Sequence, residues 1–340
     1  MHQVTTDELD VQLLNIMQVA PRISWSRAGS ILGLSSGAVA ARWARMQQAG
    51  IAWTAVQPSL TNQGTLSAFI DVWCEPRRRS EVIGHLCADP RVVSIEECSQ
   101  GRDLLLTVIV RGRERLGTFL LDDLSMMPGV TGSTCRVTTA LYSSGSHWRV
   151  GALDAQQQRE AQKSAPAYGR RAAVDLTPQD RAMVAALCVN PRESVVGLAR
   201  QVGLNPATAR RHLQRVISSG EFTFRCDMAP RFAGWPLSQY LLLRVPPAEM
   251  HRLLPALADL PQVRMCLTVT GDANLMLSVH SRTVAELTDI ERTIGRISPS
   301  IHHVDSILEL RTHKQMGWLL HPDGRATGEL VTPAVFAEAR

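Results

Sequence analysis

The sequence predicts an α+β fold in which one unit, helical first and rich in strands later, occurs twice. Three observations lead to this prediction. The second half aligns with the first without gaps, at a shift of 170 residues in a chain of 340. Within each half, apolar residues first recur at helical spacing and then alternate as they do in strands. The period is far longer than the roughly 20–50 residues of a solenoid repeat, so we expect a duplicated multidomain module.

Identities at this shift run along the whole chain. They include Asp10 and Asp180, Pro21 and Pro191, Arg22 and Arg192, Ser24 and Ser194, Gly33 and Gly203, Arg45 and Arg215, Gly50 and Gly220, Gly101 and Gly271, and Trp148 and Trp318. We therefore expect a helical domain at 1–58 and again at 176–228, and a strand-rich domain at 64–142 and again at 234–314. A linker at 143–175 has a polar middle that favours a connecting helix. The tail at 315–340 is expected to be weakly ordered after Trp318.

Three helices are predicted at the start of each unit. Acidic residues at Asp7 and Glu8 favour a helix start, and apolar residues then recur at helical spacing up to Pro21. A second short helix covers 26–32, and a third runs from about residue 36 to residue 49. The capping and stop residues are Ser24, Gly33, Ser35 or Ser36, and Gly50 in the first unit, and Thr177, Ser194, Gly203, Asn205 and Gly220 in the second. This order is the helix-turn-helix layout.

The rest of each unit alternates between strands and helices. Strands are expected at 67–74, 92–98, 104–110 and 132–142, with helices at 77–88 and 114–125. Residues 237–310 follow the same order, and residues 51–60 read as a short strand or wing. The order βαββαβ predicts a ferredoxin-like domain, a four-stranded antiparallel sheet with two helices on one face.

Composition narrows the function classes. Hydrophobic residues make up 45% of the chain, and the longest apolar runs have strand length, so no membrane partner is expected. The acidic, polar N-terminus is unlike a signal peptide, which predicts a cytoplasmic protein. Seven cysteines without a C-x-x-C pair indicate small buried residues rather than a metal site. No cofactor motif is present. The net charge of +5 permits a nucleic-acid partner.

The third helix of each unit is the candidate DNA-reading element. Its apolar face docks on the first two helices, and its polar face carries side chains suited to the major groove. The DNA-binding candidates are Ser35, Ser36, Ala38, Ala41, Arg42 and Arg45 in the first unit, and Asn205, Thr208, Arg211, His212 and Arg215 in the second. The alternative for any one arginine is simple solvation on an exposed helix.

The two copies differ in charge. Residues 1–50 carry four arginines and three acids, a net charge of +1, whereas residues 171–220 carry seven arginines and three acids, a net charge of +4. Because phosphate contact increases with basic charge, we expect the second copy to contribute more non-specific affinity. Their unlike polar faces predict unlike half-sites.

A family resemblance rests on these helices. The motifs L-D-x-x-L-L-x-x-M-Q at 9–18, P-R-I-S at 21–24, G-L-S at 33–35 and R-W-A-R-M-x-x-x-G-I at 42–51 resemble the DNA-binding domain of the Lrp/AsnC regulators of bacteria and archaea. The βαββαβ region resembles that family's amino-acid-responsive effector domain. The resemblance implies a transcriptional regulator of a bacterial cell, associated with the nucleoid, with double-stranded DNA and an amino-acid effector as partners.

The resemblance also implies an effector site near the family's Gly-Asp-x-Asp turn. The matching residues are Gly101 and Asp103 in the first unit, and Gly271, Asp272 and Asn274 in the second. Arg102 follows the glycine in the first unit, and Asn274 replaces the last acid in the second, so the effector's identity is open. A tight turn between two strands would by itself require both glycines.

Family members carry one copy and dimerise, which places two reading helices on successive half-sites. This chain has both copies, so we expect an intramolecular pseudo-dimer with the two sheets packed together and an asymmetric operator. The resemblance implies further association of such chains into homo-oligomers.

Two other functions remain open. Some relatives of this architecture resemble regulators but act as sirohaem decarboxylases that use histidines near a tetrapyrrole. The chain has ten histidines, including His302, His303 and His313. Since His302 and His303 are adjacent, a strand would place them on opposite faces, and the arginine-bearing helices favour DNA. The second alternative is a sensor that acts through a protein partner, against which the basic second copy argues.

Overall fold

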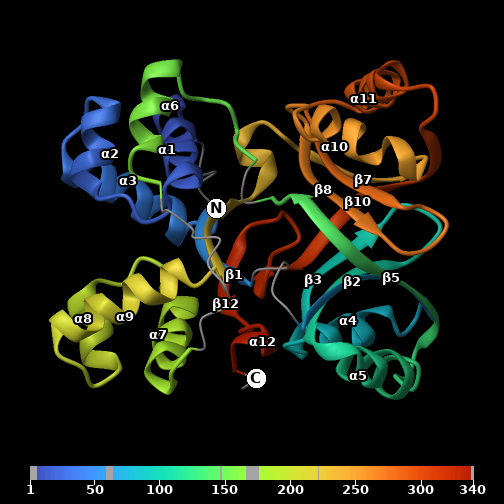
Figure 1. The fold of residues 1–340 in the computed structure, drawn as a ribbon, viewed down its shortest axis with the longest axis horizontal. Coiled ribbons are helices and arrows are strands. Elements are labelled where there is room, and N and C mark those ends of the chain that lie inside the picture. Colours follow the sequence, from blue (N-terminus) through green and yellow to red (C-terminus); the bar gives the residue numbers. More distant parts are fainter. Residues whose placement is uncertain (1–5, 59–63, 146–147, 166–175, 221, 338–340) are drawn as a thin grey trace.

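The computed structural model describes residues 6–58, 64–145, 148–165, 176–220 and 222–337. Figure 1 shows two groups of helices on one side of the molecule and the strands with their covering helices on the other. Within the described ranges, no helix combines the length and apolar character that a membrane span requires.

Each helical group has the predicted three helices. Asp7, Ser24 and Ser35 cap the helices of the first group, so Ser35 rather than Ser36 is the cap of α3. The helices are α1 (Glu8–Val19), α2 (Trp25–Leu32), α3 (Ser36–Gln48), α7 (Pro178–Val189), α8 (Val195–Gln201) and α9 (Pro206–Ser218). The predicted apolar faces are buried, namely Val39, Trp43 and Met46 on α3, and Ala209, Leu213 and Val216 on α9.

A two-stranded ribbon joins the two helical groups. The strand expected after Gly50 is present as β1 (Ala52–Pro58), and it pairs antiparallel with β6 (Phe222–Met228) of the other unit. Each ribbon strand follows directly on the third helix of its own group, so the ribbon ties the two third helices to one element.

Both strand-rich regions have the order βαββαβ. The first comprises β2 (Thr65–Cys74), α4 (Arg79–Ala88), β3 (Val92–Cys98), β4 (Leu104–Arg111), α5 (Gly112–Gly117) continued by a π-helical segment (Thr118–Leu124), and β5 (Val130–Ser143). The second comprises β7 (Leu237–Arg244), α10 (Met250–Ala258), β8 (Val263–Val269), β9 (Leu275–Ser281), α11 (Val284–Ile297) and β10 (His302–Gln315). In each, a separate apolar core lies between the sheet and its helices.

The two sheets join edge to edge within the chain. Strand β5 pairs with β8, and β10 pairs with both β3 and β7, so the strands from β10 through β3, β4, β2, β5, β8 and β9 to β7 form a closed ring. The inner faces share an apolar layer that includes Phe69, Leu105, Tyr240, Leu242 and Met276. This ring brings residues from both units to one internal space.

The C-terminal region corrects a prediction. Residues after Trp318 are not weakly ordered but form β11 (Trp318–Leu320), β12 (Ala326–Leu330) and α12 (Ala334–Ala337). Strand β11 folds back on β10, and the Ala326 amide donates to the Gly50 carbonyl at 2.8 Å. Val335 packs with Val93 and Ile109. Tertiary contacts that the local sequence does not reveal therefore hold this segment.

The linker contains the expected helix, α6 (Ala155–Gln162). It packs beside α1 and α2, and the segment before it is fastened to α1 by two buried amides. Gln18 accepts a hydrogen bond from the Val150 amide at 3.0 Å, and Asn15 accepts one from the Ala152 amide at 2.9 Å. The second helical group has a different addition, since α12 packs against α7.

Candidate functional site

The turn between the second and third helices is tightly built. Gly33 ends α2 with a φ of 69°, and the Ser35 hydroxyl then accepts the Ala38 amide at 3.2 Å. A side chain at Gly29 would lie 2.4 Å from the Leu34 carbonyl oxygen, so this position requires glycine. In the second unit the Asn205 side chain accepts the Thr208 amide at 2.9 Å. The caps therefore set the start and direction of each third helix.

Several predicted DNA-binding side chains form ion pairs inside their own domain. Arg42 and Arg45 both contact the buried carboxylate of Asp10 on α1, at 2.9 and 2.6 Å. At the corresponding positions, His212 and Arg215 contact the buried carboxylate of Asp180 at 2.7 and 3.5 Å. Burial alone would raise the pKa of Asp180, but hydrogen bonds from His212 and Thr177 hold it below its usual value. These pairs fasten each third helix to the first.

The predicted residues differ in exposure. Arg215 and Arg45 keep 43% and 48% of their side chains exposed despite their ion pairs, so each still presents its guanidinium to solvent. Ala38, Arg42, Thr208 and His212 are half-buried, whereas Ser35, Ser36, Ala41, Asn205 and Arg211 are exposed. The adjacent Arg210, not among the predicted residues, is exposed too. The second unit therefore presents the more basic third helix.

A reciprocal arginine contact joins the two helical groups. Arg192 donates to the carbonyl oxygens of Pro21 and Ile23, at 2.5 and 2.7 Å. Arg22 donates in the same way to the carbonyls of Pro191 and Glu193, the second at 2.8 Å. The Arg192 guanidinium also lies 3.8 Å from the centre of the Trp25 ring. We call this pair of arginines the clasp. It fixes how the two groups sit relative to each other.

Side chains of the predicted effector turns form hydrogen bonds with nearby backbone groups. Asp103 accepts the Cys74 amide at 2.7 Å and pairs with Arg79. Asn274 accepts the Val245 amide at 2.9 Å and donates to the Val245 carbonyl at 2.7 Å. Gly101 and Gly271 have φ values of 75° and 113°, as tight turns require. Asp272 remains exposed. This geometry gives Asp103 and Asn274 a structural role.

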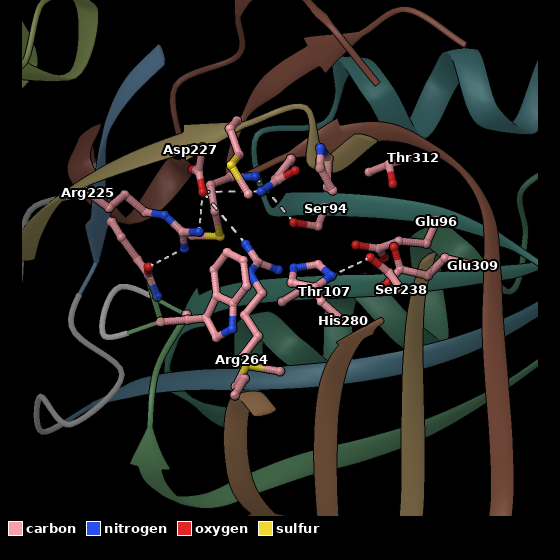
Figure 2. A pocket seen from close by; sticks show the side chains of 18 of the residues that line it. Ser94, Glu96, Thr107, Arg225, Asp227, Ser238, Arg264, His280, Glu309 and Thr312 are labelled. Carbon is pink, nitrogen blue, oxygen red and sulfur yellow. Dashed lines mark hydrogen bonds and ion pairs between the residues drawn. The ribbon is translucent and has the colours of Figure 1, made fainter. Parts of the chain in front are cut away.

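A cavity of about 110 Å³ lies where the closed sheet meets the ribbon. Its lining comes from both units, including β3, β4, β7, β8, β9 and β10, and from Arg225 and Asp227 on β6. Figure 2 shows Arg225, Asp227 and Arg264 toward one end, Glu96 and Glu309 toward the other, and His280 between them. The sequence analysis did not single out any of these residues.

Burial shifts the ionisation of the cavity's side chains. Burial raises the pKa of Glu309 to about 7, and burial together with nearby Glu309 raises the pKa of Glu96 well above its usual value. Burial and nearby Arg264 lower the pKa of His280 to about 3, so its ring is neutral at pH 7 and hydrogen-bonds Ser238 at 2.8 Å. Arg225 pairs with Asp227 and donates to Gln57 at 2.7 Å.

The domain matches follow this geometry. A family model for the AsnC-type helix-turn-helix domain matches residues 7–47, and one for a winged helix-turn-helix DNA-binding domain matches residues 176–220. A model for the Lrp/AsnC ligand binding domain matches residues 239–319. The chain therefore carries domains of the Lrp/AsnC type. The predicted α+β fold class, with winged helix-turn-helix domains and an Lrp/AsnC ligand-binding domain, is confirmed.

Curated relatives match one unit of the chain. An uncharacterised HTH-type transcriptional regulator of Pyrococcus abyssi is 29% identical over 122 residues, which cover 36% of this chain and 75% of the relative. A proline dehydrogenase transcriptional activator of Rhodobacter capsulatus is 27% identical over 129 residues, which cover 37% of this chain and 82% of the relative. Each is thus less than half as long as this chain.

One solved structure matches the chain along its length. The sirohaem decarboxylase NirDL is 14% identical, with a TM-score of 0.58 and coverage of 97% of both chains. A second structure of NirDL, in complex with an iron-uroporphyrin III analogue, has a TM-score of 0.59. At this identity the likeness extends the fold comparison to both units and carries no statement about activity.

The histidines of the alternative enzymatic hypothesis do not converge. His302 and His303 are both exposed at the start of β10, and His303 lies 3.7 Å from Glu291. His313 lies further along the strand, 2.9 Å from Glu97. The histidine in the lining of the internal cavity is His280 on β9, which the sequence analysis did not single out.

Proposed function

We propose that the chain is a sequence-specific DNA-binding transcriptional regulator that acts as an intramolecular pseudo-dimer. The observation that carries this proposal is the pair of helix-turn-helix groups held in one arrangement by the clasp and the ribbon. A family member of half this length needs a second chain to present two reading helices. A DNA-binding role would place the protein at the bacterial nucleoid, in the cytoplasm.

The two reading heads are proposed to contribute unequally. Residues 1–58 and 176–228 would be the DNA-binding domains, and 64–142 and 234–314 the sheet-forming effector domains, joined by the linker 143–175. Exposed Arg210 and Arg211 on α9 are suited to phosphates or guanine edges, whereas α3 exposes mainly small or uncharged side chains. The second head would supply most of the affinity and the first would add specificity. Arg42 and His212 would act mainly by positioning their helices.

A direct test uses DNA fragments selected from the source genome by the purified chain. Affinity for a selected fragment is measured by fluorescence anisotropy between 50 and 300 mM salt, with the same fragment shuffled in sequence as the control. The proposal predicts tighter binding to the selected fragment and a steep decline of affinity with salt. Equal affinity for the shuffled fragment would remove the claim of sequence specificity.

The proposal includes a small-molecule effector and association of chains into homo-oligomers. Support for the effector comes from the ligand-binding domain match at 239–319. Among the turn residues, Gly101, Asp103, Gly271 and Asn274 would shape the site, while exposed Asp272 would be free to contact an effector. Light scattering of the purified chain, with and without amino acids, measures the assembly state.

A second candidate function follows from the full-length fold likeness to NirDL. The internal cavity of about 110 Å³ is below the roughly 300–1,000 Å³ of sites for drug-sized ligands, whereas an open pocket beside Trp148 and Arg149 has about 760 Å³. Since His302, His303 and His313 line neither of these two pockets, we propose that the chain is not a decarboxylase. Titration with iron uroporphyrin III tests this, because a bound tetrapyrrole shifts its visible absorption band, and no shift is expected.

A further inference from the structure

The internal cavity contains buried polar atoms without partners. Glu96 is 5% exposed and its Oε2 has no hydrogen-bond partner. Asp227 and Arg225, 3% and 5% exposed, leave Oδ2 and Nε unpartnered, and the hydroxyl of Ser67 is unpartnered as well. A buried polar atom that loses its partner costs about 1–3 kcal/mol. Several such atoms around one cavity indicate that something polar occupies it.

The cavity has one cationic and one acidic end. Arg225 and Arg264 stand at one end, where Asp227 offers a single carboxylate to both, with Arg264 at 3.6 Å. Glu96 and Glu309 stand at the other, and burial favours retention of a proton by this pair. The first end therefore suits a carboxylate and the second suits an ammonium group, which would let both glutamates ionise.

The volume limits the size of the occupant. An apolar cavity of about 150 Å³ is known to hold benzene, which has six non-hydrogen atoms. The cavity of about 110 Å³ should thus hold a molecule of about five or six non-hydrogen atoms. Glycine, alanine and β-alanine have this size and carry both charges.

We propose that this cavity binds a small zwitterion, with its carboxylate on Arg264 and Arg225 and its ammonium on Glu96 and Glu309. The inference rests on the proposed regulatory function only for its consequence, which is a change in DNA binding. The site differs from the turns around Gly101 and Gly271. It is built once, since at the 170-residue shift Glu96 corresponds to Cys266 and Glu309 to Thr139.

The position of the cavity connects ligand binding to the reading heads. Arg225 and Asp227 belong to β6, which follows α9, while Glu96 and Glu309 belong to the closed sheet. A bound zwitterion would bridge the ribbon to the sheet and restrict the ribbon's movement. Both reading heads are joined to this ribbon. A ligand in the cavity would therefore change how the two heads are arranged relative to each other, and with it the affinity for DNA.

Isothermal titration calorimetry of the full chain tests the site without DNA. The probes are glycine, alanine and β-alanine, with leucine as a size control and acetate and methylamine as single-charge controls. We expect at least one small zwitterion to bind, and each control to bind at least tenfold more weakly. Binding of leucine as tight as that of glycine would overturn the assignment to this cavity.

Variants locate the binding. Glu96→Gln removes the ammonium partner, and Thr107→Leu fills the cavity without changing any charge, so the second remains informative if the first fails to fold. Each is expected to weaken binding at least tenfold, whereas Asp122→Asn, at an exposed carboxylate on the segment Thr118–Leu124, should change it less than twofold. No binding of any small zwitterion at 10 mM, or unchanged binding in a folded Thr107→Leu variant, would refute the proposal. DNA binding is measured separately on the unliganded chain, so the cavity site and the proposed DNA-binding function can each fail without the other.

Discussion

Replacing Arg192 by alanine removes one half of the clasp, and the structure sets the size of the effect. The side chain donates two charged hydrogen bonds, at 2.5 and 2.7 Å, each worth about 1.5–3 kcal/mol. Its stacking on Trp25 adds about 0.5–2 kcal/mol. Burial opposes these gains, since it lowers the pKa of the guanidinium from 12.5 to about 10, equivalent to about 3 kcal/mol. These contributions leave a net loss of about 0.5–5 kcal/mol, centred on about 3 kcal/mol.

Thermal unfolding measures this loss. At about 2.1 cal/mol/K per residue, 340 residues give an unfolding entropy of about 0.7 kcal/mol/K, so the melting temperature should fall by about 4 °C. Arg113→Ala, at an exposed arginine on α5, is the matched control and should shift it by less than 1 °C. If Arg192→Ala has the same melting temperature as the wild type, the clasp does not hold the helical groups together and the reasoning is refuted.

Three further predictions follow. Gly50 and Gly33 both have a φ of 69°, but only at Gly50 would a Cβ meet another atom, the Ala326 carbonyl oxygen at 2.3 Å. Gly33→Ala should therefore lower the free energy of unfolding in urea by about 1–2 kcal/mol through backbone strain, and Gly50→Ala should lower it by about 1–3 kcal/mol more. Equal losses would mean that the C-terminal segment does not pack against Gly50. Arg211→Ala should lower the slope of log affinity against log salt for DNA by about 1, and an unchanged slope would place this arginine away from the phosphates. Glu309 has a folded pKa of about 7 against 4.5 when unfolded, so folding takes up a proton and the wild type should lose stability as pH rises from 4.5 to 7. Glu309→Gln should remove up to about 3 kcal/mol of this loss, measured as the free energy of unfolding in urea at pH 5, 6, 7 and 8. If the free energy of unfolding depends on pH in the same way in both proteins, the raised pKa of Glu309 is contradicted.

Local signals in the sequence predicted most of the secondary structure, but not β11, β12 and α12 of the C-terminal region. The caps at Ser24, Ser35 and Asn205 lie where the helices begin, and the strand predicted at 92–98 is β3. These elements follow from side-chain spacing and cap chemistry within a few residues of chain. Strand pairing was harder to predict, because alternation indicates which face is buried and not which strand lies alongside. The pairing of β1 with β6 across the two units was therefore missed.

The candidate site was predictable in part. Residue types placed Arg42 and His212 on the polar side of the third helices, but their pairing with Asp10 and Asp180 depends on helix packing. The identity of Asp10 and Asp180 at the 170-residue shift was the available signal, and Arg22 with Arg192 gave the same signal for the clasp. The charged residues of the cavity gave no such signal in the sequence, because a charged residue in an alternating strand normally faces solvent.

The central claim is that one chain presents two unlike reading heads to one operator. The most direct measurement mixes the purified chain with fragmented genomic DNA at physiological salt and sequences the bound fragments. We predict a small set of sites with two unequal half-sites whose centres lie about 34 Å, one helical turn, or a multiple of it apart. Absence of enrichment, or enrichment of a single half-site without a partner at fixed spacing, would contradict the account.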